Sequence, residues 1–249
     1  MSRQRSVLIT GANGGMGKAL CALFQQRGWC VIATDLHPEP AAMCKTYVAA
    51  DLLRVGMEPS YCADCLRRMQ ASLPDPGRLD LLINNAARQV VAPVERLTAA
   101  DWQETMTVNV TAAFLLVQGF LRELECAGGM VINIASVHAQ LTKSQFTAYA
   151  TSKAAVVGFT RALAVELGGR VRVNAVCPAA VATPMLVAGF EGNTEGLDKL
   201  AACHPSRCIG MPEDVAGLVF SLTEQSSHYI TGAIINVDGG IGSRLFDPA

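Results

Sequence analysis

The sequence predicts an α/β protein built on a doubly wound parallel sheet. Short apolar runs alternate with longer helical stretches along the 249 residues. The runs are nearly continuous in Val, Ile and Leu, which is typical of strands buried on both faces of a parallel sheet. Alternation of this kind gives right-handed crossovers and a doubly wound sheet. No internal repeat, low-complexity tract or linker interrupts it, so we expect residues 1–249 to form a single domain.

Seven of the apolar runs are expected to be strands. They cover residues 6–10, 30–35, 46–50, 79–84, 130–135, 170–177 and 234–237. The helical spacing of Leu20, Leu23 and Phe24 predicts a helix over 17–27. Thr98 stands three residues before Asp101, as in a capped helix start, and predicts a helix from there to about residue 124.

Two more helices and one irregular segment complete the pattern. Residues 149–167 carry small and apolar side chains on every face, so this helix is expected to be buried or packed against a partner. Pro212 precedes Glu213 and Asp214, an arrangement that starts a helix. Residues 184–210 break the alternation. A long insertion in a compact domain is commonly functional, so we expect a substrate lid at about 184–210.

Composition excludes several classes of protein. Lys and Arg total 20 against 21 Asp and Glu, a net charge of −1, which removes the electrostatic argument for a nucleic-acid partner. No apolar run approaches the roughly 18 residues that span a bilayer. The N-terminal apolar stretch ends at Gly11, too short for a signal peptide. We therefore expect a cytoplasmic protein with no membrane partner.

Nine cysteines are too few for a disulfide scaffold and are expected to be reduced and mostly buried. Only Cys62-x-x-Cys65 has the spacing of a metal or redox site, and no second pair completes a four-ligand set. No metal is therefore expected. Any redox or metal role of Cys62 and Cys65, or of Cys203 and Cys208, stays open.

A glycine-rich turn follows the first expected strand and reads Thr10-Gly11-Ala12-Asn13-Gly14-Gly15-Met16-Gly17. Glycine permits a tight turn and lets a pyrophosphate approach the backbone. The N–H groups at the start of the following helix then bind the anion. A glycine-rich loop alone is a weak signal, but its position between the first strand and the first helix predicts a dinucleotide site.

The second expected strand ends at Asp35, 18 residues after Gly17. A carboxylate there accepts hydrogen bonds from the ribose 2′-hydroxyl and repels a 2′-phosphate. No Arg or Lys stands in the turn before Gly15. The sequence therefore favours NAD(H) over NADP(H); the alternative for Asp35 is an ordinary turn residue.

Tyr149 and Lys153 are four residues apart at the start of a predicted helix, so their side chains share one face. A nearby cation lowers a tyrosine pKa, which makes Tyr149 a candidate general acid/base with Lys153 as its tuner. Ser136 closes the fifth expected strand, at the edge where open α/β sheets bind ligands. An isolated Tyr-x-x-x-Lys match is more often a surface tyrosine near a solvated lysine.

Taken together, these motifs resemble the short-chain dehydrogenase/reductase family, in its NAD-preferring group. The matching features, in order, are Thr10-Gly11-x-x-x-Gly15-x-Gly17, Asn84-Asn85-Ala86-Ala87, Asn109, Ser136 and Tyr149-x-x-x-Lys153. The resemblance extends from Val7 to the Val237-Asp238-Gly239-Gly240 end. It implies a single-domain Rossmann fold, a doubly wound seven-stranded parallel sheet with helices on both faces.

The resemblance also implies a catalytic set. Tyr149 transfers the proton, Lys153 holds the nicotinamide ribose and lowers the Tyr149 pKa, and Ser136 orients the substrate oxygen. Asn109 supports a water that leads to Lys153. The implied cofactor-binding residues are Gly11, Asn13, Gly15, Met16, Gly17, Asp35, Asp51, Leu52, Asn85, Ala86, Tyr149, Lys153, Pro178, Val181 and Thr183.

Two positions depart from the family pattern. This chain has Pro178-Ala179 where Pro-Gly is usual, and Ala87 where the Asn-Asn-Ala motif usually ends in Gly. An alanine is strained wherever the backbone needs a positive φ. The departures therefore bear on the pose of the nicotinamide and leave the reaction class unchanged.

The substrate is less well determined. Gln89, Ser136, His138 and Tyr149 are the expected substrate residues, since the segments around Gln89 and His138 are similar to those of hydroxybutyrate dehydrogenases. Phe146 and Gly189 replace a lysine and a glutamine of those enzymes, and sugar dehydrogenases share the Ser-x-His pattern. Lys143 and Arg88 either supply a cation or are solvated. Lid residues Met185, Leu186 and Phe190 favour an apolar pocket.

The sequence therefore predicts an NAD(H)-dependent oxidoreductase that interconverts a secondary alcohol and a ketone, with Tyr149 as general acid/base. The substrate is a small molecule: a hydroxy acid, a sugar, a steroid-like compound or another carbinol. The alternative is a non-catalytic NAD(H)-binding sensor or scaffold of the same fold. The resemblance also implies that helices 98–124 and 149–167 pack against copies of themselves in a homodimer or homotetramer.

Overall fold

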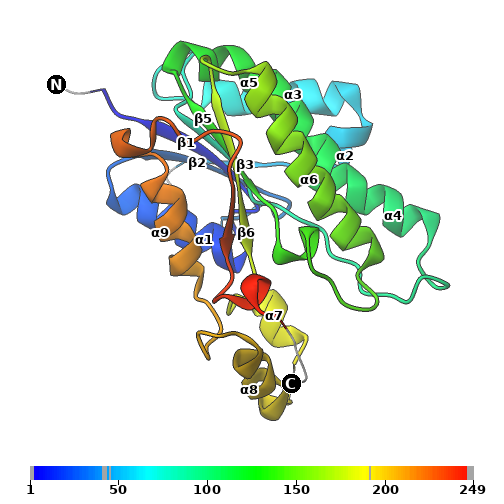
Figure 1. Ribbon diagram of the computed structural model, residues 1–249. Helices are drawn as coiled ribbons and strands as arrows, with labels where there is room; N and C mark the ends of the chain where they lie inside the picture. The colour runs from blue at the N-terminus through cyan, green and yellow to red at the C-terminus, as the bar shows by residue number, and fades with distance from the viewer. Residues whose placement is uncertain (1–2, 41–43, 45, 191, 246–249) are drawn as a thin grey trace.

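One parallel sheet of seven strands lies at the centre of the molecule (Figure 1). The computed structural model describes residues 3–40, 44, 46–190 and 192–245. The strands are β1 (Ser6–Thr10), β2 (Cys30–Asp35), β3 (Thr46–Ala49), β4 (Leu81–Asn84), β5 (Met130–Ile134), β6 (Arg172–Pro178) and β7 (Ile234–Val237). Their order is β3-β2-β1-β4-β5-β6-β7. The order reverses between β1 and β4, so the crevice at their carboxyl ends is the expected ligand site.

Helices cover both faces of the sheet, which confirms the doubly wound Rossmann fold (Figure 1). On one face lie α1 (Gly15–Gln26) and α9 (Pro212–Ser221); on the other lie α3 (Pro59–Ala71), α5 (Ala112–Ala127) and α6 (Thr147–Glu166). Val7 and Ile9 of β1 belong to the core under α1 and α9, whereas Leu8 belongs to the opposite core. Successive side chains of a strand point to opposite faces, so a strand covered on both sides must be apolar throughout.

All seven predicted strands form, with boundaries that differ by at most two residues at either end. The predicted helix start at Thr98 is confirmed, because the Thr98 hydroxyl accepts a hydrogen bond from the Asp101 N–H at 3.0 Å. The single helix predicted from there is wrong in one detail. It consists of α4 (Ala99–Met106), a π-helical turn at Thr107–Thr111 and α5.

Two helices have no counterpart in the sequence prediction: α2 (Leu52–Met57) and α3. The apolar face of α3 consists of Cys62, Cys65 and Met69, a weak signal among its charged residues. Both cysteines are buried in the core beside the sheet. Their spacing therefore serves packing, and no group of three or more His, Cys, Asp or Glu in the described part of the chain is placed to hold a metal.

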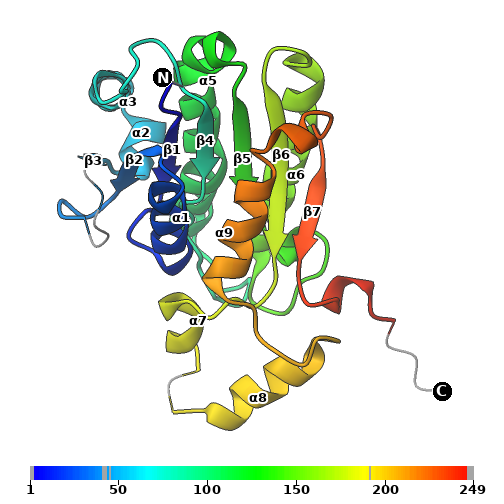
Figure 2. The ribbon, with the colours of Figure 1, turned by 90° about the vertical axis from the view of Figure 1, so that its left-hand side faces the viewer.

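The segment 184–210 carries α7 (Pro184–Ala188) and α8 (Thr194–Cys203), both beyond the carboxyl ends of the strands (Figure 2). It lies outside the layers formed by the sheet and its covering helices. Short 3₁₀ turns occur at Val137–Ala139, Gln225–Ser227 and Ile241–Ser243. The placement of α7 and α8 puts this segment on the side of the sheet where the ligand crevice opens.

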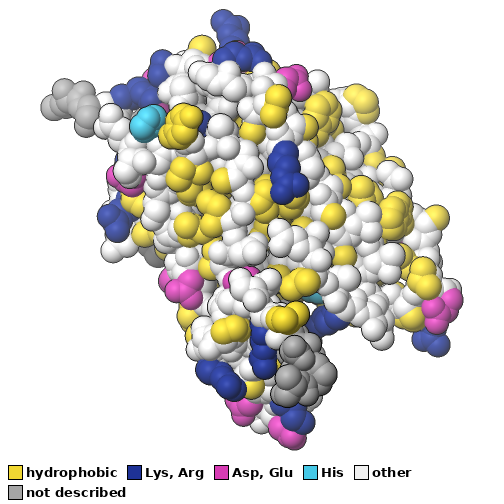
Figure 3. All heavy atoms as spheres, viewed as in Figure 1, with side chains coloured by type: hydrophobic (Ala, Val, Ile, Leu, Met, Phe, Trp, Pro, Cys, Tyr) yellow, Lys and Arg dark blue, Asp and Glu magenta, His cyan; other side chains and the backbone are white. Residues whose placement is uncertain are grey.

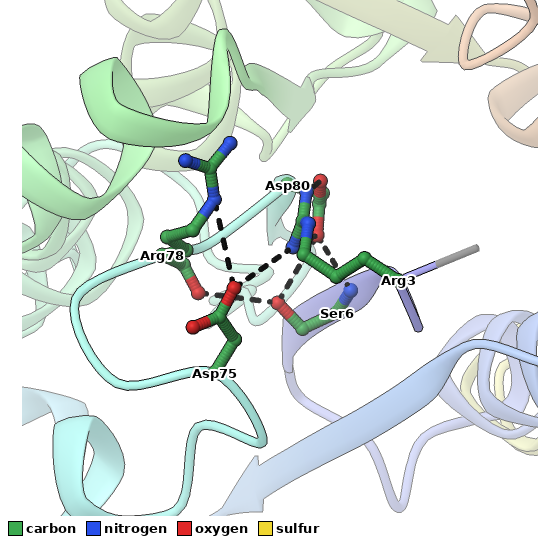
Figure 4. A network of polar contacts seen from close by, with 5 residues as sticks. All are labelled: Arg3, Ser6, Asp75, Arg78 and Asp80. Atoms are coloured by element: carbon green, nitrogen blue, oxygen red, sulfur yellow. Dashed lines mark hydrogen bonds and ion pairs between the residues drawn. The ribbon is translucent and has the colours of Figure 1, made fainter. Parts of the chain in front are cut away.

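The opposite, amino-terminal edge of the sheet is closed by a polar network (Figure 4). The Asp80 carboxylate accepts hydrogen bonds from the Ser6 N–H at 2.8 Å and from the Arg3 guanidinium at 3.0 Å. Asp75 forms ion pairs with Arg3 at 3.8 Å and with Arg78 at 3.7 Å. These contacts join the starts of β1 and β4. They are structural, because they lie at the end of the sheet away from the crevice.

The continuous helical stretch Ala99–Ala127 is long and apolar enough to cross a membrane by length and composition, although the sequence shows no uninterrupted apolar run of that length. Within it, Leu116, Phe120 and Leu124 of α5 pack into the core against the sheet. The core helix of a soluble protein passes the same test. The stretch is therefore weak evidence for a membrane span.

Candidate active site

The glycine-rich turn joins β1 to α1 as predicted. Gly11 has a φ of +65°, and a Cβ there would lie 2.7 Å from Cα of Ala86. A Cβ on Gly17 would lie 2.1 Å from the Gly11 carbonyl oxygen. Gly14 precedes α1 in an extended conformation and makes no side-chain cap. The N–H groups of the first turn of α1 thus remain available to an anion. This cradle fits the pyrophosphate of a dinucleotide.

Thr10 and Asn85 fasten this turn to the end of β4. The Thr10 hydroxyl accepts hydrogen bonds from the N–H groups of Asn85 at 2.9 Å and Ala86 at 3.0 Å. In return, the Asn85 side-chain amide donates to the carbonyls of Thr10 at 2.8 Å and Gly11 at 3.1 Å. The Asn85 Oδ1 atom is buried and has no partner among the described residues. A buried acceptor of this kind needs a donor, which a bound ligand can supply.

A cleft of about 680 Å³ runs from this turn along the carboxyl ends of the strands. Thirteen of the fifteen predicted cofactor residues line it: Gly11, Asn13, Gly15, Met16, Gly17, Asp35, Asp51, Leu52, Asn85, Ala86, Tyr149, Lys153 and Thr183. Pro178 and Val181 do not line it. Pro178 ends β6 and Val181 is buried in a bridge with Gly210. Thr183 lies at the cleft, and its hydroxyl caps α7 by accepting from the Leu186 N–H at 3.3 Å.

Two carboxylates define the far end of the cleft. The Asp35 carboxylate accepts a hydrogen bond from the Asn13 N–H at 3.0 Å, which fixes it beside the turn. Asp51 caps α2 by accepting from the Leu53 N–H at 2.9 Å. Leu36 and His37 also line this end. Among the described residues that line the cleft, no lysine or arginine lies next to Asp35 in the sequence.

At the other end, the first turns of α6 bring the predicted reacting groups together. The Ser136 side chain interacts with Tyr149 in the sense that favours the phenolate. The Lys153 ammonium nitrogen lies 5.6 Å from the centre of the Tyr149 ring and donates to the Ile134 carbonyl at 2.7 Å. Lys153 is only 2% exposed. The i, i+4 spacing thus places the Lys153 ammonium beside the Tyr149 ring, as predicted.

The predicted direction of the Tyr149 pKa shift is wrong for this polypeptide. Burial raises the pKa of Tyr149 to about 12, and the hydrogen bond from Ser136 offsets only part of that rise. Burial also lowers the pKa of Lys153 to about 8. Low-dielectric surroundings disfavour the charged form of each group. Desolvation is the largest cause of both shifts, and the attraction between phenolate and ammonium on which the sequence argument relied is not among the causes of either shift.

Asn109 lies in the π-helical turn between α4 and α5, where an interrupted helix often marks a functional site. Its side chain accepts from the Arg88 N–H at 2.7 Å and donates to the Arg88 carbonyl at 3.0 Å. It also donates to the Ser152 hydroxyl at 2.8 Å, which in turn donates to the Tyr149 carbonyl at 2.7 Å. Asn109 is therefore linked to the backbone of Tyr149.

A small cavity of about 10 Å³ lies between Asn109 and Lys153. Asn84 also lines it, and the Asn84 Oδ1 atom is buried without a partner among the described residues. Such a volume holds about one water molecule, provided that polar partners surround it. The cavity therefore suits the water that the family resemblance places between Asn109 and Lys153.

Of the four predicted substrate residues, Tyr149 lines the main cleft, whereas Gln89, Ser136 and His138 do not. The His138 ring contacts the Tyr149 ring edge-on, with 5.7 Å between their centres. The His138 Nδ1 atom is 2.9 Å from the Thr142 hydroxyl. Gln89 is half-buried on the loop after β4. The structure therefore brings His138 and Ser136 to the reacting tyrosine.

Sequence reasoning missed several residues of the site. Ser152 lies within the Tyr-x-x-x-Lys motif and was not singled out, although position i+3 faces the same side of the helix as Tyr149. Leu36 and His37 follow Asp35 directly, which is the signal that could have placed them at the cleft. Neither Ala87 nor Ala179 has a positive φ. The two departures from the family pattern are therefore free of strain.

Comparisons with known proteins agree with this geometry. A family profile described as enoyl-(acyl carrier protein) reductase matches residues 11–242. D-threitol dehydrogenase of Mycolicibacterium smegmatis is 32% identical over 241 residues, which cover 94% of this chain and 91% of that protein. The chain belongs to the short-chain dehydrogenase/reductase family. It is thus an oxidoreductase of a family that acts on CH–OH groups.

Two solved structures of the short-chain dehydrogenase/reductase family contain a nicotinamide cofactor. A 4-hydroxyisoleucine dehydrogenase with NADH has a TM-score of 0.86 at 25% identity, and the match covers 97% of this chain and 100% of that one. A protein of Beutenbergia cavernae described as an NAD(P)-dependent gluconate 5-dehydrogenase, with bound NADP, has a TM-score of 0.84 at 31% identity, over 96% and 97% of the chains. Relatives of this fold therefore use either cofactor.

Proposed function

We propose that this short-chain dehydrogenase/reductase is an NAD(H)-dependent oxidoreductase that interconverts a secondary alcohol and a ketone, with Tyr149 as general acid/base. The observation that carries the proposal is one cleft with Asp35 at one end and Tyr149, which interacts with Ser136, at the other. A nicotinamide ring, when bound, supplies or accepts the hydride. The protein supplies the position of the substrate oxygen and the proton.

Each residue of the reacting end has a role that follows from its contacts. Ser136 lies close enough to Tyr149 to affect its pKa, so its hydroxyl can donate a hydrogen bond to a substrate carbonyl beside Tyr149 and orient it. Tyr149 donates its proton to a ketone oxygen or accepts one from an alcohol. Lys153 holds a positive charge close to the ring in the same buried region. Asn109 positions this turn of α6 through Ser152.

NAD(H) is the proposed cofactor because of the charge at Asp35. Its carboxylate lies at the cleft on the N–H of Asn13, where it can accept from a ribose hydroxyl. A 2′-phosphate at the same place meets a like charge, and like charges repel by several kcal/mol at short range in a partly buried site. The lining next to Asp35 holds Leu36, His37 and residues of the glycine-rich turn, and no lysine or arginine of the described residues is adjacent to Asp35 in the sequence.

We also propose that residues 184–210 act as a lid, since Met185 lines the cleft from α7.

The partner is a second copy of the chain, in a homodimer or homotetramer. Phe114 of α5 and Val165 of α6 are large apolar side chains exposed at 43% and 86%. Figure 3 shows hydrophobic side chains spread over the middle of the face that carries α6 and β7. Light scattering measures the number of subunits. A cytoplasmic location fits the nine free thiols.

The test of the function uses Tyr149→Phe, with Tyr229→Phe as its matched control. Tyr229 is 92% exposed and lies on the loop before β7. A general acid/base contributes about 10²–10⁴-fold to a rate, so Tyr149→Phe should lose that much of kcat while NADH still binds by fluorescence. The substrate comes from a screen of alcohols, hydroxy acids and sugars that follows NADH absorbance. Wild-type rates for Tyr149→Phe would contradict its acid/base role, whereas no turnover of any compound by the wild type would favour the sensor alternative.

A further inference from the structure

Two stacked rings lie against Tyr149 on the substrate side of the site. The rings of His138 and Phe146 are parallel to within 4°, with centres 4.6 Å apart. Each meets the Tyr149 ring edge-on, His138 at 5.7 Å and Phe146 at 6.2 Å. We call this pair the His138–Phe146 stack. It forms a wall against the ring of Tyr149, with His138 half-buried and Phe146 buried.

The cations near this wall are already engaged. Arg88 and Lys153 are the only lysine or arginine side chains among the described residues that line the cleft. Lys153 donates to the Ile134 carbonyl at 2.7 Å. Arg88 forms ion pairs with Glu104 at 2.8 Å and Asp101 at 3.6 Å.

The two remaining basic groups do not replace them. Lys143, on the loop before α6, places its ammonium nitrogen 4.8 Å from the centre of the Phe146 ring, an attractive cation–π contact. Burial, and next the charge of Lys143, lower the pKa of His138. The imidazole is therefore neutral at neutral pH. A substrate carboxylate at the wall would lose water without gaining a free cation.

The cleft that Tyr149 lines adds apolar surface. Met185 of α7 lines it with an exposed side chain, and Ala87 and Val108 line it as well. A flat apolar group in this cleft gains favourable contacts with a thioether and with an aromatic ring.

We propose that the substrate of this site is an uncharged secondary alcohol or ketone whose flank is flat and apolar, and that the His138–Phe146 stack selects it against hydroxy and keto acids. The inference rests on the proposed function, because it concerns the substrate of the same reaction. It selects one class among the carbinols that the sequence leaves open.

Matched ketone pairs that differ in charge test this. The pairs are methyl acetoacetate with acetoacetate, and methyl 4-acetylbenzoate with 4-acetylbenzoate, each reduced with NADH by the wild-type enzyme. We expect kcat/KM to be at least tenfold higher for the ester of each pair, and higher for the aromatic ester than for the aliphatic one. Equal or better turnover of the acids overturns the inference and leaves the proposed function standing. Both the inference and the proposed function are overturned if none of the four ketones is reduced and the Tyr149→Phe variant is identical to the wild type in the substrate screen.

Three variants test the stack itself. Phe146→Lys adds a cation beside Tyr149 and should reduce the ester-to-acid ratio at least tenfold, whereas Leu141→Lys adds the same charge on the exposed part of the loop and should leave the ratio unchanged. Because Phe146 is buried, NADH binding and circular dichroism check its fold. His138 is half-buried, and His138→Ala serves as the second probe of the stack. It should raise KM for the aromatic ester more than for the aliphatic one. The inference is contradicted if the two lysine variants change the ester-to-acid ratio equally, or if His138→Ala raises KM equally for both esters.

Discussion

The proposed preference for NAD(H) depends on one charge, and Asp35→Asn removes that charge while it retains a side-chain oxygen. In the structure the Asp35 carboxylate accepts from the Asn13 N–H at 3.0 Å, a contact that an amide oxygen can also make. A phosphate charge about 4 Å from the carboxylate is repelled by about 1 kcal/mol in water and about 4 kcal/mol at an effective dielectric constant of 20. Each 1.4 kcal/mol is a factor of ten. For the half-buried Asp35 we expect the ratio of kcat/KM for NADP to that for NAD to rise about ten- to a hundredfold.

The assay compares both cofactors at one substrate concentration by absorbance of the reduced nicotinamide. Asp64→Asn is the control, since it makes the same change of net charge on the surface of α3, in ion pairs with Arg67 and Arg68. It should leave the ratio unchanged. Equal use of NAD and NADP by the wild type, or an Asp35→Asn ratio that matches the Asp64→Asn ratio, refutes the electrostatic argument.

Three further changes test the site and its support. Asn109→Ala leaves two backbone groups and one hydroxyl without their partner, so urea unfolding should show a loss of about 2–4 kcal/mol; an unchanged midpoint contradicts this. Lys153 loses its proton above about pH 8 in the folded protein but only above about pH 10.5 in the unfolded chain. The free energy of unfolding of the wild type, relative to that of Lys153→Met, should therefore rise by about 3 kcal/mol between these pH values. A difference that does not change with pH rules out the shift. Gly17→Ala should abolish NADH binding, because the added Cβ clashes with the Gly11 carbonyl. In the control Gly217→Ala the added Cβ has no neighbour within 4 Å, so this variant should stabilise α9 by about 0.5–1 kcal/mol in thermal unfolding.

The parts of the fold that the sequence predicted are those in which one local rule decides the outcome. Three successive residues of strand β1, Val7, Leu8 and Ile9, are apolar because both faces of the strand are covered, and that pattern is visible without any knowledge of the neighbours. The cap at Thr98 needs only Asp101 three residues later. The turn from Gly11 to Gly17 depends on contacts that only glycine permits. Each of these signals is contained within about eight residues of chain.

The parts that were missed depend on distant neighbours. Helix α3 buries Cys62, Cys65 and Met69 because the sheet and α5 lie beside it, while its own composition is polar. The π-helical turn at Thr107–Thr111 places Asn109 against Arg88 and Ser152, residues 21 and 43 positions away. No periodicity within the helix announces such a turn. The same holds for the engagement of Arg88 by Glu104, which decides whether the site has a free cation.

The pKa of Tyr149 shows most clearly why spacing alone is insufficient. The i, i+4 relation with Lys153 predicts proximity, and the ammonium does lie 5.6 Å from the ring. Proximity fixes the sign of the coulombic effect, but burial acts on both partners in the opposite sense: the pKa of Lys153 falls to about 8 and that of Tyr149 rises to about 12. At neutral pH the tyrosine is therefore protonated and the lysine charged, which is the protonation state of an acid ready to donate to a ketone oxygen. In the direction of alcohol oxidation Tyr149 must first lose its proton, and burial opposes that ionisation. The polypeptide by itself therefore favours the role of Tyr149 as the acid.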